Sequence, residues 1–136
     1  MSFDLINPPE LGEPRGWTHG ILGPAGGRVL LVAGQDASVP SSGVVETDDF
    51  VDQFGLALTK AVRVVEAAGG GVSDIGRLTI YVTDMAEYRA ARKALGPAYR
   101  SVMGRHFPAM ALVEVSALVD ERARVEIEAT AVLAPT

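Results

Sequence analysis

The 136-residue sequence has no cysteine and only two histidines. The missing cysteine excludes a disulfide framework, a thiolate metal site and a cysteine nucleophile. The two histidines, His19 and His106, lie far apart in the sequence and give only a weak signal for a metal site. We therefore expect neither a metal nor a cofactor.

Long apolar segments and basic runs are also absent. No stretch approaches the roughly 18 apolar residues of a membrane-spanning helix, and residues 1–16 match neither a signal peptide nor a transit peptide. The twelve basic residues are scattered in a chain of net charge −5, whereas a nucleic-acid surface needs concentrated positive charge. The one local cluster, Arg89, Arg92 and Lys93, has the pattern of a solvated helix face. The sequence thus predicts a cytoplasmic protein with no membrane and no nucleic acid among its partners.

The length and composition fit a single domain over residues 1–136. Apolar residues make up 48% of the chain and charged residues 21%, the balance of an ordinary globular protein. A chain of this size buries about two-thirds of its unfolded surface, so it can build its own core. Residues 1–15 contain three prolines, and we expect them to form an irregular N-terminal lead-in.

Two segments have the apolar spacing of amphipathic helices. The first begins near Thr47 or Asp48, either of which can cap it, and ends at the AAGGG of residues 67–71. The second begins at Asp84, which forms a capping-box pattern with Glu87.

This second helix contains a glycine-proline step. Gly96-Pro97 predicts a kink or a short break, and Gly104 predicts the end of the helix.

Five segments have the pattern of short strands, and they are residues 16–22, 29–34, 77–83, 110–118 and 124–133. The last of them alternates apolar residues with Glu126, Glu128 and Thr130. Strands and helices in this order predict an α+β fold, with a mixed β-sheet and two helices packed on one face. The other face would carry Glu126 and Glu128, together with Leu112 and Glu114 or their neighbours. A sheet face that mixes aliphatic and acidic residues indicates a homo-oligomer.

Three stretches carry a family resemblance. They are VLLVAGQ (29–35), EAAGGGVSDIGRLTIYVTDMAEY (66–88) and HFPAMALVEVSALVDERARVEIEATAV (106–132). In this order they resemble the YjgF/RidA family of reactive-intermediate, or imine, deaminases. The resemblance covers nearly the whole chain after Arg15.

The resemblance implies a chorismate-mutase-like fold and a homotrimer with three small-molecule clefts between neighbouring subunits. It also implies hydrolysis of imines and enamines such as 2-aminoacrylate. An arginine directly after a Pro-Ala pair grips the substrate carboxylate in such deaminases. Backbone groups and a glutamate on the last strand help to place the water.

Met110 departs from this pattern, because it follows Pro108-Ala109 where the deaminases have their arginine. A guanidinium forms a bidentate pair with a carboxylate, whereas a thioether offers an apolar surface and no donor. Met110 is either a wall of the pocket or a residue that fills the core. Binding of the substrate carboxylate is therefore weakened unless Arg105, His106 or Arg15 supplies another cation.

The acidic candidates for the site lie on the last two strands. Glu128 either orients water or is a glutamate satisfied by hydrogen bonds at the trimer axis, and Glu126 on the same face is its rival. Glu114 either contacts ligand or forms an ion pair between subunits.

The remaining candidates lie before the strand predicted at 29–34 and at its end. Trp17 and His19 align with a Tyr-Ser segment of the deaminases, and both line the cleft if that alignment holds. His19 is either a general acid or base or a structural histidine. Gly34 and Gln35 shape the cleft by close approach of their backbone.

Two functions remain open on this reading. One is a RidA-like trimer that hydrolyses imines, enamines or related carbonyl compounds, with Glu128 and His19 as the catalytic residues. The other is a trimer that binds a metabolite without turnover. A nuclease or translation inhibitor is disfavoured by the acidic balance of the chain.

Overall fold

The computed structural model describes residues 3–136. The two long helices are α1 (Phe50–Ala67) and α2 (Met85–Met103). The strands are β1 (Asp4–Ile6), β2 (Gly20–Leu22), β3 (Arg28–Gln35), β4 (Ile75–Val82), β5 (Ala109–Glu114) and β6 (Val125–Leu133). Two short 3-10 turns are η1 (Pro9–Leu11) and η2 (Val72–Asp74).

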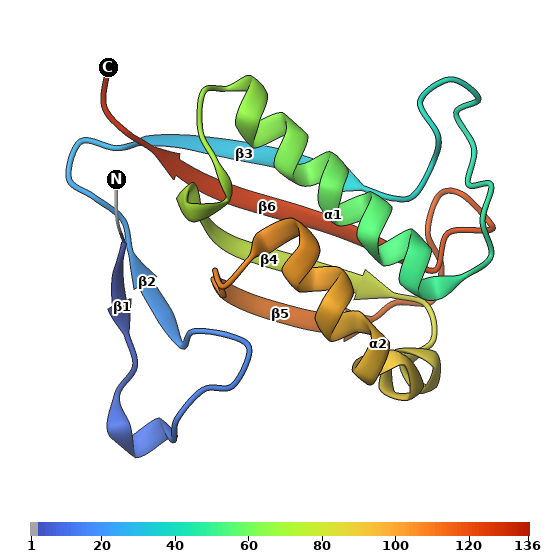
Figure 1. Cartoon of the computed structure of the whole chain (residues 1–136), viewed down its shortest axis with the longest axis horizontal. Helices are drawn as coiled ribbons and strands as arrows, with labels where there is room; N and C mark the ends of the chain where they lie inside the picture. Colours follow the sequence, from blue (N-terminus) through green and yellow to red (C-terminus); the bar gives the residue numbers. More distant parts are fainter. Residues whose placement is uncertain (1–2) are drawn as a thin grey trace.

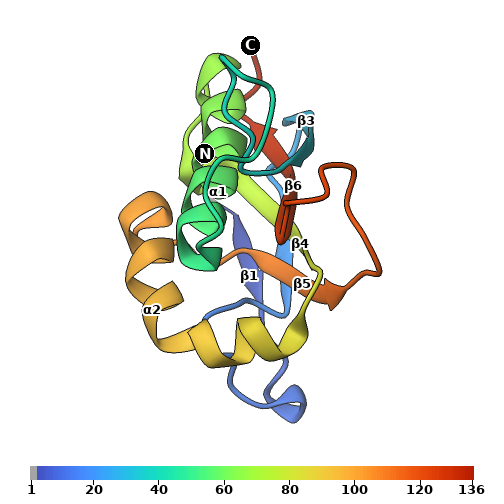
Figure 2. The ribbon, with the colours of Figure 1, turned by 90° about the vertical axis from the view of Figure 1, so that its right-hand side faces the viewer.

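The four longer strands form one mixed sheet in the order β3-β6-β4-β5. β4 and β5 are parallel and are joined through α2, while β6 is antiparallel to both β3 and β4. Figure 1 shows α1 and α2 lying across this sheet, and the turned view in Figure 2 shows both helices on the same side of it. The predicted α+β fold is therefore confirmed, with two helices covering one face and leaving the other open.

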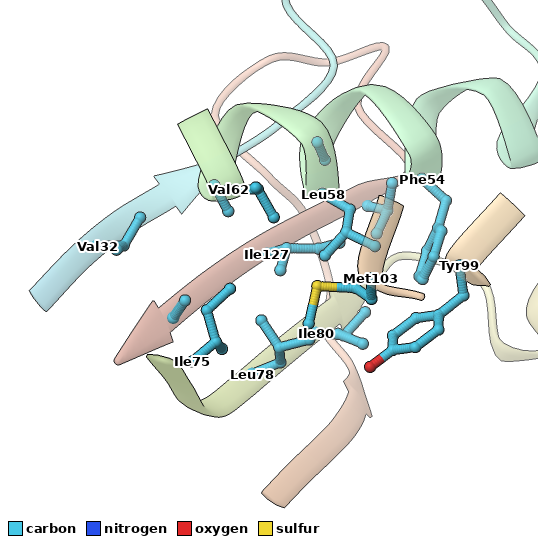
Figure 3. Packing of buried hydrophobic residues seen from close by; sticks show 14 of the residues in the cluster. Val32, Phe54, Leu58, Val62, Ile75, Leu78, Ile80, Tyr99, Met103 and Ile127 are labelled. Atoms are coloured by element: carbon cyan, nitrogen blue, oxygen red, sulfur yellow. The ribbon is translucent and has the colours of Figure 1, made fainter. Parts of the chain in front are cut away.

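The core lies between the helices and the covered face of the sheet. Figure 3 shows Phe54 and Leu58 of α1 packed over Ile127 of β6, with Met103 of α2 beside them. β6 alternates buried and half-buried residues along its whole length, as its sequence predicts. Within residues 3–136, neither long helix is long and apolar enough to cross a membrane.

The cap of α1 lies slightly later than the sequence suggests. Asp49 is the cap, because its carboxylate accepts a hydrogen bond from the Asp52 backbone N–H at 2.9 Å. Thr47 instead accepts a bond from the Asp49 N–H, so it supports the cap from outside the helix. The expected cap at Thr47 or Asp48 is therefore wrong by one or two residues.

α2 begins at the predicted cap and bends as predicted. Asp84 accepts a hydrogen bond from the Glu87 N–H, but the Glu87 carboxylate pairs with Arg124 at 2.6 Å and does not close a capping box. Pro97 lies inside a continuous helix, so no break occurs. Figure 2 shows the change of direction between the first turns of α2 and its last. A proline that clashes with the preceding turn accounts for such a bend.

The lead-in and the first predicted strand differ from expectation. Residues 1–15 contain β1 and η1, and only the end of the predicted strand at 16–22 is a strand. β2 pairs antiparallel with β1 in a separate two-stranded sheet, so it does not join the main one. The strand predicted at 110–118 also ends early, at Glu114.

The two faces of β5 are fixed by its parallel register with β4. Met110 and Leu112 lie beside Leu78 and Ile80, whose side chains are buried under the helices. Leu112 and Glu114 therefore belong to the helix side, and their neighbours Ala111 and Val113 share the open face with Glu126 and Glu128.

The open face keeps large apolar side chains in contact with solvent. Val29 and Leu31 on the β3 edge are 66% and 76% exposed, and Val113 on the opposite edge is 44% exposed. Exposed apolar groups at both edges of one face are typical of a surface that another protein covers.

Candidate functional site

A pocket of about 570 Å³ opens between α2, β5 and the segment before β2. We call it the Met110 pocket. Its aromatic lining consists of Trp17, Phe54, Tyr88, Tyr99 and Phe107. Its aliphatic lining consists of Ile80, Leu95, Met110 and Leu112. The volume and the apolar walls are those of a site for a small organic molecule.

Thr18 fixes the N-terminal wall of this pocket. Its hydroxyl donates to the Phe107 carbonyl at 2.6 Å, and its backbone N–H donates to the Pro108 carbonyl at 3.3 Å. Thr18 is buried, so these bonds hold the preceding residues against the start of β5. Trp17 thereby joins Met110 in the lining of the pocket.

The base of the pocket is held by a pair of stacked rings. Tyr99 and Phe107 are 5.3 Å apart between ring centroids and nearly parallel, and the Tyr99 hydroxyl donates to the His106 carbonyl at 2.6 Å. Burial raises the pKa of the Tyr99 hydroxyl well above its usual range, so this group stays protonated. The pair is a rigid apolar support, not an acid or base.

Three arginines complete the lining of the pocket: Arg15 before β2, and Arg92 and Arg100 on α2. No acidic residue lines it, and none of the ion pairs within residues 3–136 involves these three guanidinium groups. The guanidinium of Arg100 lies over Gly96, where an added β-carbon would meet Nη1 at 3.2 Å. The Met110 pocket therefore combines apolar walls with positive charge only.

A second group of candidate residues lies on the open face of the sheet. β3 has a register irregularity between Val32 and Gln35, typical of a β-bulge, and Gly34 lies within it. A β-carbon at Gly34 would be 2.4 Å from Oε2 of Glu126, so the backbone and this carboxylate approach each other closely. Bulges of this kind occur beside active sites, where they redirect the strand.

Glu126 and Glu128 differ in what they contact. Glu128 accepts a hydrogen bond from the Tyr81 hydroxyl, which raises the pKa of that tyrosine. The Glu126 carboxylate has no hydrogen-bond partner among residues 3–136. Burial, followed by the negative charges of Asp36 and Glu128, raises the pKa of Glu126. Glu126 is therefore the carboxylate that remains available for a ligand or a water.

Several predicted residues lie outside both groups. Glu114 accepts a hydrogen bond from the Met85 N–H at 2.8 Å, at the start of α2. Arg105 is exposed after α2 and is not part of the pocket lining. The Gln35 side chain donates to the Ala33 carbonyl at 3.2 Å.

Both histidines contact backbone carbonyls. Nε2 of His19 lies 3.0 Å from the Gly12 carbonyl, and the His19 ring packs edge-on against Trp17. Nε2 of His106 lies 2.6 Å from the Ile75 carbonyl. Among residues 3–136, no three histidine or acidic side chains are grouped so that they could hold a metal.

Comparison with known proteins gives the family. A family model described as Endoribonuclease L-PSP matches residues 15–133. The 2-iminobutanoate/2-iminopropanoate deaminase of Salmonella typhimurium is 34% identical over 106 residues, 78% of this chain and 80% of that protein. The chain belongs to the YjgF/RidA family.

Solved structures of the YjgF/RidA family have the same fold. The Rid-family protein YyfB of Yersinia pestis superposes with a TM-score of 0.81 at 31% identity, over 98% of this chain and 100% of that one. TdcF of Escherichia coli, solved with bound serine, has a TM-score of 0.67 at 26% identity, over 89% of this chain and 97% of its own. The predicted family and fold are thus confirmed.

Sequence reasoning missed Arg92 and Arg100. Arg92 has the pattern of a solvated helix face when it is grouped with its neighbours Arg89 and Lys93. The available signal was the spacing of Tyr88, Arg92, Gly96 and Arg100, which recur every four residues on one stripe of α2.

Proposed function

We propose that this YjgF/RidA protein is a homotrimer that binds small imines, enamines or related carbonyl compounds in clefts between subunits and hydrolyses them. The observation that carries the proposal is the division of the candidate site within one chain. The Met110 pocket lies on the helix side at the β5 edge, while Gly34 and Glu126 lie on the open face toward the β3 edge. Three strand spacings separate those edges, or roughly 14 Å.

A neighbouring copy can bring the two halves together. Exposed Val29 and Leu31 on one edge and exposed Val113 on the other give each copy apolar surface to bury against the next. A ring in which the Met110 pocket of one subunit faces Glu126 of the next would contain one cleft per interface. The number of three subunits follows from the family resemblance.

The proposed chemistry is the addition of water to a carbon–nitrogen double bond. Water adds to the imine carbon, and the resulting carbinolamine expels ammonia to leave a carbonyl compound. Glu126 accepts a proton from the attacking water and returns it to the departing nitrogen. Its raised pKa suits that exchange. Glu126 takes this role instead of Glu128, because Glu128 is already bound to Tyr81.

Met110 limits which substrate this chemistry can serve. A 2-imino acid has its carboxylate next to the reacting carbon, and the family resemblance places an arginine at position 110 to hold it. A thioether supplies no such donor, and losing a charged hydrogen bond typically costs about 1.5–3 kcal/mol, or roughly tenfold to a hundredfold in binding. The protein should therefore act weakly on 2-aminoacrylate.

The test compares wild type and Met110→Arg on freshly generated 2-aminoacrylate, with ammonia release as the readout. We expect weak wild-type turnover and a gain of about tenfold or more in the arginine variant. Wild-type activity that already equals that of the arginine variant would contradict the proposed weakening at position 110. Inactivity of both proteins would contradict the hydrolase.

The specific observation of methionine at position 110 also favours a second function. A trimer that binds a metabolite without turnover needs no group poised at the reacting carbon. A thermal-shift screen separates the two functions, because a tight ligand raises the unfolding temperature whether or not it reacts. A stabilising imine or carbonyl compound that is never consumed would support the binding protein.

A further inference from the structure

We infer that the Met110 pocket binds an organic anion with an apolar body, and that Arg92 and Arg100 of α2, with Arg15, hold its charge. The inference rests on the proposed use of this pocket as one half of the cleft. It moves the charged group of the ligand away from position 110 and assigns it to a different element of the fold. The apolar body would lie against the aromatic lining.

The first argument is the positive charge of the pocket lining. Its lining contains three arginines and no acidic residue, and none of the three arginines forms an ion pair within residues 3–136. The whole chain has a net charge of −5, so a purely positive lining is not a reflection of its composition. Low-dielectric walls strengthen the field of such a cluster at the pocket mouth. The charge of the pocket therefore selects anions.

The arrangement of α2 carries the second step. Arg92 and Arg100 are two helical turns apart on the stripe that also bears Tyr88, Leu95 and Tyr99 of the lining. Gly96 lies between them, and the Arg100 guanidinium rests directly over it. A β-carbon there would meet Nη1 at 3.2 Å and shift the guanidinium by a few tenths of an ångström, so the glycine lets this cation lie close to α2 at the pocket wall.

The size and chemistry of the walls carry the third step. About 570 Å³ is far more space than a three-carbon imino acid fills, and five aromatic side chains line it. An aromatic body could stack on these rings while its carboxylate pairs with guanidinium donors. The size and aromatic walls of the Met110 pocket therefore fit an aryl-substituted carboxylate better than a small aliphatic one.

The intrinsic fluorescence of the protein reports on this pocket directly, because Trp17 lines it and is the only tryptophan in the chain. The probes are 3-phenylpropanoate, its uncharged amide and pyruvate, each titrated into the full-length protein. We expect the aryl carboxylate to bind at least about tenfold more tightly than either the amide or pyruvate. Added salt should weaken its binding, because the arginines are exposed.

Substitutions test the assignment of the charge. Arg92→Leu and Arg100→Leu should each weaken 3-phenylpropanoate binding by about tenfold and leave the binding of the amide unchanged. Arg89→Leu is the matched control, since Arg89 lies on the same helix, is exposed and does not line the pocket. Equal losses in Arg89→Leu and Arg92→Leu would overturn the inference, because they would reflect net charge alone. Tight binding of the amide, or no binding of the carboxylate, would also overturn it.

Turnover separates this inference from the proposed function. If the aryl carboxylate binds in an arginine-dependent way and no imine is hydrolysed, the anion site is supported and the proposed hydrolase function is refuted. The opposite outcome is also distinguishable. If the aryl carboxylate does not bind, and hydrolysis of 2-aminoacrylate is unchanged when Arg92 and Arg100 are both replaced, the anion site is refuted and the hydrolase is supported.

Discussion

Gly34→Ala should separate the catalytic role of Glu126 from the stability of the fold. The added methyl group would lie 2.4 Å from Oε2 of Glu126 and 2.9 Å from its Cδ. The carboxylate has to withdraw by about 1 Å to reach ordinary van der Waals contact at 3.4 Å. A displacement of about 1 Å at a reacting centre can cost about a hundredfold in rate. We therefore expect the imine hydrolysis rate to fall by that factor.

Stability should change little in the same variant. The atoms that must move form the flexible end of a side chain, and Gly34 does not have the positive φ that would strain an alanine. The measurements are ammonia release from 2-aminoacrylate, in the wild-type and Met110→Arg backgrounds, and the unfolding temperature of each protein. An unchanged rate would refute the role of Glu126. A large loss of stability would refute the reasoning about the contact.

Three further predictions concern stability, and each is measured by thermal or denaturant unfolding. Thr18→Val should lower the free energy of unfolding by about 1–2 kcal/mol, because it leaves the Phe107 carbonyl without its buried donor. Thr18→Ser keeps the hydroxyl and should lower it less, and equal losses in the two variants would contradict the role of the hydroxyl. Gly55 lies within α1, and a β-carbon added there would meet nothing within 4 Å, so Gly55→Ala should stabilise the protein by up to about 1 kcal/mol. A destabilised variant would show that the added methyl group meets an obstacle. Asp120 accepts a hydrogen bond from the buried Val45 N–H, and this bond lowers the pKa of Asp120 below 3.8. The carboxylate therefore contributes to the free energy of unfolding above that pH, and this contribution is lost as the pH falls through the folded-state pKa. Asp120→Asn should therefore lower the unfolding temperature near pH 7, and its difference from wild type should shrink as the pH falls below 3.8, whereas a pH-independent difference would exclude this linkage.

Regular patterns in the sequence predicted most of the fold. The strict alternation in residues 125–133 reappears as the buried and half-buried faces of β6, because a strand against one packed layer has only one register that buries its apolar set. The bend of α2 was predictable from Pro97, since a proline acts on the turn that precedes it.

The first strand shows why local patterns are insufficient. Residues 16–22 have strand composition, but pairing decides which of them form a strand, and the partner is β1 in the proline-rich lead-in. Thr18 instead bonds to Phe107 and Pro108, far away in sequence. No local pattern reports a contact of that kind.

The candidate site was predicted in part. Trp17 and Met110 were expected in one cleft, and the structure brings them into one pocket. Sequence reasoning favoured Glu128 over Glu126, although both have the same period, because periodicity does not show that Glu128 is bound to Tyr81 while Glu126 lies against Gly34. Arg92 was hidden among exposed charges because helix periodicity alone does not show which stripe borders a pocket.

The proposed cleft is shared by two copies of the chain, and a mixing experiment tests this most directly. Glu126→Gln disables one half of the proposed cleft and Met110→Glu disables the other, by placing an acid among the pocket walls. Each variant alone should be inactive, whereas co-assembled chains should recover about a quarter of wild-type imine hydrolysis, because one cleft in four then combines two intact halves. No recovery in verified mixed oligomers would contradict the shared cleft.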